Sequence, residues 1–123
     1  MTAGGGALPT ALAGTRILAF TQLGAGPYAM TLLGDLGAEI IKVEDPVTGG
    51  DEARNVPPFA GDGDSLYFQA LNRNARSMTL NLRVAAGRAL LRRLAATCDA
   101  VYSNPVSYTH LRAHETVLDL VCR

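Results

Sequence analysis

Two short apolar segments flank a helical segment bounded by proline and glycine, and this arrangement constrains the fold more than any other feature. Residues 16–20 (Arg-Ile-Leu-Ala-Phe) and 39–44 (Glu-Ile-Ile-Lys-Val-Glu) have the length and composition of strands. Pro27 suits the first turn of a helix, because its missing N–H would be unpaired there. Gly37 suits the left-handed residue that ends a helix. A strand, a helix and a strand in this order predict a parallel pair with a right-handed crossover.

The helix between these strands has a regular apolar pattern. Ala29, Leu32, Leu33 and Leu36 fall at positions i, i+3, i+4 and i+7. This spacing places them on one side of a helix, so they are predicted to form its buried face.

The alternation of strands and helices continues along the chain. The expected elements are a short helix over 65–71, a strand over 77–82 with Met78, Leu80 and Leu82 on one face, a helix over 84–98 and a strand from residue 99. The predicted buried face of the third helix comprises Leu90, Leu91, Leu94, Ala95 and Cys98. Strands that alternate with helices predict an α/β fold, a Rossmann-like three-layer parallel sheet.

Charge and hydropathy exclude several classes of partner. The formal net charge is zero, so no nucleic-acid partner is predicted. No apolar run is long enough for a membrane span, and no membrane partner is expected. The two cysteines form no disulfide framework, and a cytoplasmic location is expected. Residues 1–13 are predicted to be a flexible leader, and residues 14–104 a partial α/β domain.

Residues 105–123 differ in character from the rest of the chain. They resemble the translation of a transposase-type sequencing adapter, and a non-native tail is therefore expected; an ordinary amphipathic helix is the alternative. His110 and His114 lie at i and i+4 with Glu115 adjacent, which is a spacing that zinc ligands use. Because both histidines fall in this tail, no metal site is predicted.

The loop from Thr21 to Pro27 is the first candidate site. It follows a strand and opens a helix, so its N–H groups and the helix dipole could hold a phosphate or a thioester oxygen. Gly24-x-Gly26 lacks the third glycine of a dinucleotide fingerprint, and a tight turn without a ligand is the alternative.

The segment 72–77 (Asn-Arg-Asn-Ala-Arg-Ser) is the second candidate site. Arg73 and Arg76 supply two guanidinium groups, with the amides of Asn72 and Asn74 beside them. These groups suit a phosphate or diphosphate, and a solvated loop is the alternative.

Several ordered motifs resemble the N-terminal part of the family III coenzyme A transferases, which include formyl-CoA transferase, carnitine-related CoA-transferases and 2-methylacyl-CoA racemases. The resemblance covers about residues 12–104. Its main segments are Leu12 to Leu18, Ala25 to Ala29, Leu33 to Glu44, Gly50-Asp51, Pro57 to Phe59, Tyr67-Phe68, Leu71 to Asn74, Arg76-Ser77, Gly87 to Leu94 and Asp99 to Asn104.

This resemblance implies a CoA-binding domain of an interlocked homodimer. It places Gln22, Leu23, Gly24 and Ala25 against CoA and the active centre, Leu71, Asn72, Arg73, Asn74 and Arg76 at the nucleotide end of CoA, and Asn104 in the lining of the site. The substrates would be an acyl-CoA and a carboxylic acid, with no prosthetic group. The catalytic aspartate, which forms acyl-anhydride and CoA-thioester intermediates, would lie downstream, so this chain is expected to be inactive.

Other functions remain open at this point. A racemase of the same family would exchange the proton α to the thioester carbonyl instead of transferring CoA. A nucleotide-binding module without chemistry of its own and a non-functional reading frame are further alternatives. The sequence also departs from the family pattern, which often has lysine in place of Ala75 and a basic residue near Asp45.

Overall fold

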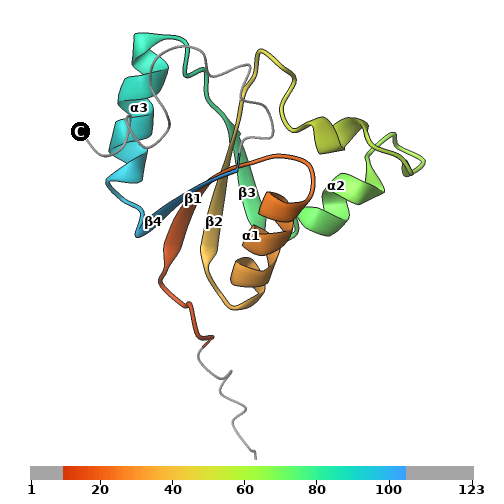
Figure 1. Ribbon diagram of the computed structural model, residues 1–123, viewed down its shortest axis with the longest axis horizontal. Helices are drawn as coiled ribbons and strands as arrows, with labels where there is room; N and C mark the ends of the chain where they lie inside the picture. The colour runs from red at the N-terminus through yellow and green to blue at the C-terminus, as the bar shows by residue number, and fades with distance from the viewer. Residues whose placement is uncertain (1–9, 105–123) are drawn as a thin grey trace, which may run out of the picture.

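A computed structural model describes residues 10–104, which form one parallel sheet with helices on both faces (Figure 1). The strands follow the order β3-β2-β1-β4, and every neighbouring pair is parallel. The elements are β1 (Arg16–Thr21), α1 (Ala25–Asp35), β2 (Glu39–Glu44), the 3-10 helix η1 (Glu52–Asn55), α2 (Leu66–Leu71), β3 (Ala75–Thr79), α3 (Ala85–Ala95) and β4 (Ala100–Asn104). The predicted α/β class and the parallel crossover are confirmed.

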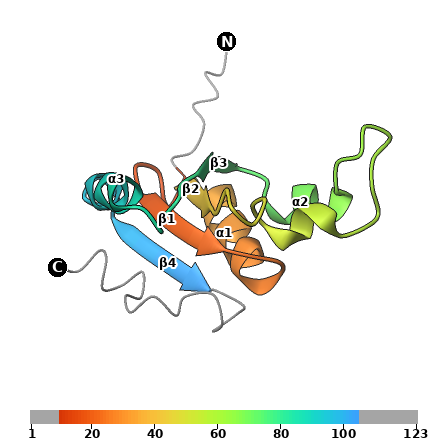
Figure 2. The same cartoon turned by 90° about the horizontal axis from the view of Figure 1, so that it is seen from above.

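The sheet separates two apolar clusters, which makes the fold a three-layer structure. Figure 2 shows α3 on one side of the sheet and α1 on the other. Leu18 of β1 packs in the cluster beneath α3, together with Leu91. Ile17 and Ala19 point the other way and pack with Met30 of α1. Side chains of successive β1 residues therefore point to opposite faces of the sheet, as in any strand. Helix α3 covers one face and α1 the other.

Helix α1 ends as predicted, but only part of its predicted face is buried. Gly37 has φ +98°, and its N–H donates to the carbonyl of Gly34 at 2.9 Å. The fully buried positions of α1 are Gly26, Pro27, Met30 and Thr31. Leu32 and Leu36 are 44% and 49% exposed, so their predicted burial is wrong.

The reason lies in how closely α1 approaches its neighbours. The Thr31 hydroxyl donates to the carbonyl of Leu71 at 2.7 Å, and Gly34 lies against Asn74 and Ile40. Small residues permit this short separation, whereas leucines at the same positions would hold the helix away from the sheet. Leu32 and Leu36 therefore lie on the outer side, whereas Ala29 and Leu33 are partly buried against the apolar cluster.

Two later elements also differ in detail from the sequence prediction. Strand β3 begins and ends earlier than predicted, but Met78, Leu80 and Leu82 do pack against the same apolar cluster. In α3, Leu91 is fully buried while Leu90 is 44% exposed, so the buried face is narrower than predicted. Within residues 10–104, no helix is both long and apolar enough to cross a membrane.

Candidate functional site

The turn between β1 and α1 lies at the carboxyl end of the central strand. Leu23 has φ +61°, an uncommon backbone conformation for a residue other than glycine. Gly24 is the N-cap of α1, and no side chain forms a cap hydrogen bond with this end of the helix. The first N–H groups of a helix have no intrahelical partner. This uncapped terminus thus offers backbone donors and a partial positive charge.

Asn104 lies beside this turn because β4 pairs with β1. The register aligns Thr21 with Asn104 at the carboxyl ends of the two strands. A Cβ at Gly26 would lie 2.6 Å from Cγ and Oδ1 of Asn104, so the asparagine packs directly on the backbone of α1. Oδ1 of Asn104 is inaccessible to solvent and has no hydrogen-bond partner among the described residues. The structure therefore brings the 22–25 turn and Asn104 together.

A buried ion pair lies behind the turn. Lys42 of β2 and Asp51 are 2% and 1% exposed, and the Lys42 Nζ donates to the Asp51 Oδ2. The Asp51 Oδ1 accepts the N–H of Leu23 at 3.0 Å and that of Ala53 at 2.9 Å. Lys42 also donates to Oδ1 of Asn72 at 2.6 Å. One buried cation thereby connects both predicted site segments.

A second buried carboxylate supports the same loop. Glu44 accepts two hydrogen bonds from Arg54, at 2.9 and 2.7 Å, and further ones from the Ser77 hydroxyl and the N–H of Asp51. Burial on its own raises the pKa of Glu44, but these hydrogen bonds outweigh that effect and lower the pKa to about 2. The network therefore holds a charged carboxylate within the protein.

The remainder of the second predicted segment lies at the other edge of the sheet. Arg73 and Asn74 donate to Asp35 at the end of α1, each at 2.6 Å, and Arg76 donates to Glu39 at 3.3 Å. The Arg73 hydrogen bond lowers the pKa of Asp35. Arg73 and Asn74 precede β3, and Arg76 is its second residue, so all three lie at the amino ends of the strands. The structure does not bring Arg73, Asn74 or Arg76 to the 22–25 turn.

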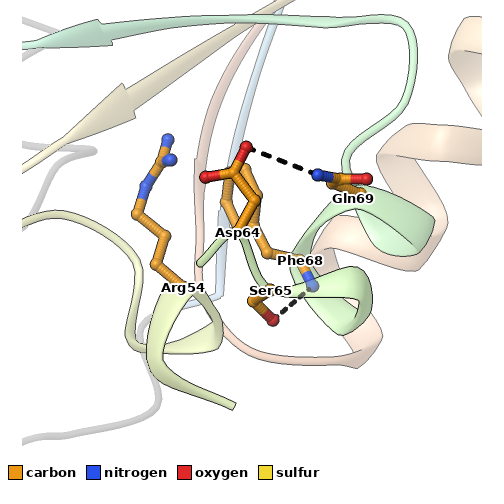
Figure 3. Close-up of a pocket in the computed structure, with 5 residues that line it drawn as sticks. All are labelled: Arg54, Asp64, Ser65, Phe68 and Gln69. Atoms are coloured by element: carbon orange, nitrogen blue, oxygen red, sulfur yellow. Dashed lines mark hydrogen bonds between the residues drawn. The ribbon is translucent and has the colours of Figure 1, made fainter. Parts of the chain in front are cut away.

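A small pocket near η1 and α2 contains none of the predicted site residues (Figure 3). Its volume is about 110 Å³, and it is lined by Arg54, Asp64, Ser65, Phe68 and Gln69. The Arg54 guanidinium carbon lies 3.9 Å from the centroid of the Phe68 ring. Ligand pockets typically measure about 300–1,000 Å³, so this one is too small to hold a nucleotide cofactor.

Sequence reasoning missed Lys42 and Asp51 as parts of the site. A usable signal was present, because Lys42 is the only lysine of the chain and lies in the apolar strand 39–44. A charged residue in such a strand requires a buried partner. Its partner could not be identified from the pattern alone, because the 45–64 loop contains several acidic residues.

Comparison with known proteins shows the family of this chain. The family model for CoA-transferase family III matches residues 12–113. That range extends into the 105–123 tail, where the structure describes no residue, so His110 and His114 lie outside the described residues. The match covers most of the chain. The protein therefore belongs to CoA-transferase family III.

Individual relatives agree with this assignment. Human succinyl-CoA:glutarate CoA-transferase is 44% identical over 95 residues, which cover 77% of this chain and 22% of that protein. Formyl-CoA:oxalate CoA-transferase of Afipia carboxidovorans is 44% identical over 94 residues, or 76% and 22% of the two chains. The chain thus spans less than a quarter of the length of either relative.

Solved structures have the same fold. A CaiB/BaiF family protein from Brucella suis superimposes with a TM-score of 0.71 at 39% identity, over 80% of this chain and 26% of that one. A hypothetical protein from Mycobacterium tuberculosis superimposes with a TM-score of 0.66 at 42% identity, over 75% of this chain and 24% of that one.

Proposed function

We propose that this chain is the N-terminal, CoA-binding part of an enzyme that transfers CoA between an acyl-CoA and a carboxylic acid. The observation that carries the proposal is the meeting of the 22–25 turn, the uncapped start of α1 and Asn104 at the carboxyl edge of the sheet. Open parallel α/β sheets generally bind their ligands at this edge. The relatives named above are CoA-transferases, which supports transfer rather than racemisation.

In this proposal the turn binds the thioester end of CoA. A carboxylate of the complete protein attacks the thioester carbonyl carbon, the C–S bond breaks, and CoA leaves as a thiolate to give a mixed anhydride. Backbone N–H groups at the start of α1 stabilise the negative charge that develops on the carbonyl oxygen. The turn thus serves to orient the thioester and to stabilise charge, and no residue of this chain is assigned as the nucleophile.

The second segment is proposed to bind the nucleotide end. Asn72 accepts a hydrogen bond from the buried Lys42, and the carbonyl of Leu71 accepts one from Thr31. Arg73 and Arg76 are largely exposed, with 53% and 81% of their side chains accessible. A phosphate would have to replace Asp35 or Glu39 as the partner of these guanidinium groups. Exposed ion pairs are worth only about 0–1 kcal/mol, so such an exchange costs little. A cytoplasmic homodimer without a prosthetic group is part of the same proposal.

The test requires the complete protein encoded at the source locus. Recovering that reading frame by an adapter-free method also tests whether residues 105–123 are native. The purified protein should move CoA from succinyl-CoA to glutarate or from formyl-CoA to oxalate. Chromatography of the CoA thioesters measures this transfer. Assays without an acceptor acid control for hydrolysis. Absence of both CoA transfer and CoA binding would contradict the proposal.

A further inference from the structure

Leu23 has a strained backbone conformation at the point where the chain enters the candidate site. Its φ of +61° is unfavourable for a residue with a Cβ, and leucine lacks the short polar side chain that helps asparagine or aspartate adopt it. Such outliers persist when the surrounding structure over-determines them. Contacts outside the turn must therefore hold Leu23 in this conformation.

The N–H of Leu23 donates to a carboxylate that lies outside the turn. Its acceptor is Oδ1 of Asp51, at 3.0 Å, from a residue that is 1% exposed. The same oxygen accepts the N–H of Ala53, and Oδ2 is paired with Lys42. The carboxylate is thus held in place by the N–H of Ala53 and by Lys42, independently of its hydrogen bond with Leu23. A hydrogen bond to a charged acceptor is stronger than one between neutral groups, and it compensates for the unfavourable φ.

The cation that holds Asp51 is itself fixed. Lys42 lies in β2, donates to Asn72 at 2.6 Å, and has its Nζ 5.3 Å from the centroid of the Phe68 ring. Buried ion pairs are often no more stabilising than apolar residues of similar volume. Stability alone thus gives little reason for this pair. The direct contact of its carboxylate with the turn suggests a different role.

We propose that Asp51, held in place by Lys42, is a positioning residue for the CoA site: its carboxylate fixes Leu23 in the left-handed conformation and so sets the path of the 22–25 turn. This inference rests on the proposed function. It adds that a residue remote in sequence determines how the turn meets the thioester end of CoA. Misplacing such a turn by about 1 Å can cost on the order of a hundredfold in rate.

The experiment compares variants of the complete protein by steady-state kinetics and by calorimetry with CoA. Asp51→Ala is expected to lower kcat/KM and weaken CoA binding, each by roughly tenfold or more. Asp51→Asn retains an oxygen acceptor for Leu23 and should recover most of the affinity even if its Tm is lower. Leu23→Gly in the Asp51→Ala background should also restore activity in part, because glycine adopts positive φ without a steric penalty. Leu23→Gly alone is the reference for this double variant.

Arg54→Met is the control for a general loss of stability. It disrupts the neighbouring pair with Glu44 but removes no partner of the Asp51 carboxylate. It is expected to lower Tm while leaving the affinity for CoA unchanged. If Asp51→Ala fails to fold, Leu23→Pro and Leu23→Ala test the same bond from the turn. Both variants lose the leucine side chain, but only proline loses the N–H and excludes positive φ.

The outcomes separate the two proposals. Suppose that the wild-type protein binds and transfers CoA. If Asp51→Ala then changes only Tm, the positioning role alone is overturned. If Asp51→Ala does not fold, the same conclusion follows when Leu23→Pro differs from Leu23→Ala only in Tm. The positioning role would also be overturned if Asp51→Ala loses activity and neither Asp51→Asn nor Leu23→Gly in the Asp51→Ala background recovers any of it. A wild-type protein that neither binds nor transfers CoA would overturn the proposed function, and the positioning role with it.

Discussion

Gly26 links the packing of α1 to the candidate site at the scale of single residues. The sequence shows Gly24-x-Gly26 only as an incomplete nucleotide motif. The structure explains why position 26 is glycine, because Asn104 occupies the space that a side chain there would need. Any larger residue there must displace Asn104 or lift the start of α1.

Gly26→Ala is therefore expected to destabilise the protein by about 1–3 kcal/mol, as overpacking usually does. It should also weaken CoA binding by displacing Asn104. Gly61→Ala is the matched control, since nothing lies within 4 Å of a Cβ at that position. Thermal unfolding and calorimetry measure the two effects. Equal behaviour of the two variants would mean that Asn104 moves aside without consequence.

Glu44 is expected to make stability depend on pH. Its pKa falls from an ordinary 4.5 to about 2 in the folded protein. A lowered folded-state pKa stabilises the protein above pH 4.5, and this contribution is lost as the pH falls from 4.5 toward 2. Glu44→Gln should cost on the order of 2 kcal/mol at neutral pH and should flatten the acid side of a plot of Tm against pH. Parallel curves for the two proteins would contradict this assignment.

At the scale of elements, periodicity and turn residues were sufficient to predict which segments form strands and helices. They were less informative about which face each helix buries. In α1, leucines dominate the pattern, yet Leu32 and Leu36 are exposed, and Gly26 and Thr31 are buried where the helix lies close to the sheet and to α2. This close approach depends on contacts such as Thr31 with Leu71, which are remote in sequence.

The candidate site was predictable only in part for the same reason. The loop from Thr21 to Pro27 could be found because it follows a strand and opens a helix, and the family resemblance narrowed it to residues 22–25. The link from Leu23 to Asp51 depends on how the 45–64 loop folds back, and no local pattern encodes that path. The sequence was sufficient to recognise Arg73 and Arg76 as two nearby cations. Their position at the amino edge of the sheet depends on where β3 begins, which the sequence did not predict correctly.

The two arginines at the start of β3 give a test at this scale. Replacing Arg73 and Arg76 together by alanine in the complete protein is expected to weaken CoA binding roughly tenfold or more. Little stability should be lost, because both ion pairs are exposed. Arg93→Ala, an exposed arginine on α3, is the matched control. Unchanged affinity in the double variant would limit both arginines to a structural role with Asp35 and Glu39.

At the scale of the whole molecule, the described residues leave apolar surface uncovered. Tyr28, Leu32 and Leu36 recur every four residues along α1 and are 53%, 44% and 49% exposed. Strands β3 and β4 are the outer strands of the sheet that residues 10–104 form. Exposed apolar stripes and open strand edges both favour association.

The 123-residue chain is therefore expected to self-associate when expressed alone. Light scattering after size-exclusion chromatography should give a mass above 12.9 kDa. Leu32→Glu with Leu36→Glu should lower the associated fraction, whereas glutamate at the already exposed Val47 should not. A monodisperse wild-type monomer with a cooperative thermal transition would contradict this expectation.

The pairing of β1 with β4 has a consequence for the order of events during synthesis. The second residue of β1, Ile17, pairs with Ala100, so the two strands leave the ribosome far apart in time. A nascent chain can complete β1, α1 and β2 while one edge of β1 is still unpaired, because N-terminal segments are available first. Asn104 then arrives with β4, the last strand along the chain among residues 10–104. A nascent chain stalled before residue 100 would carry the turn and the helix start but would lack the amide that lies beside them.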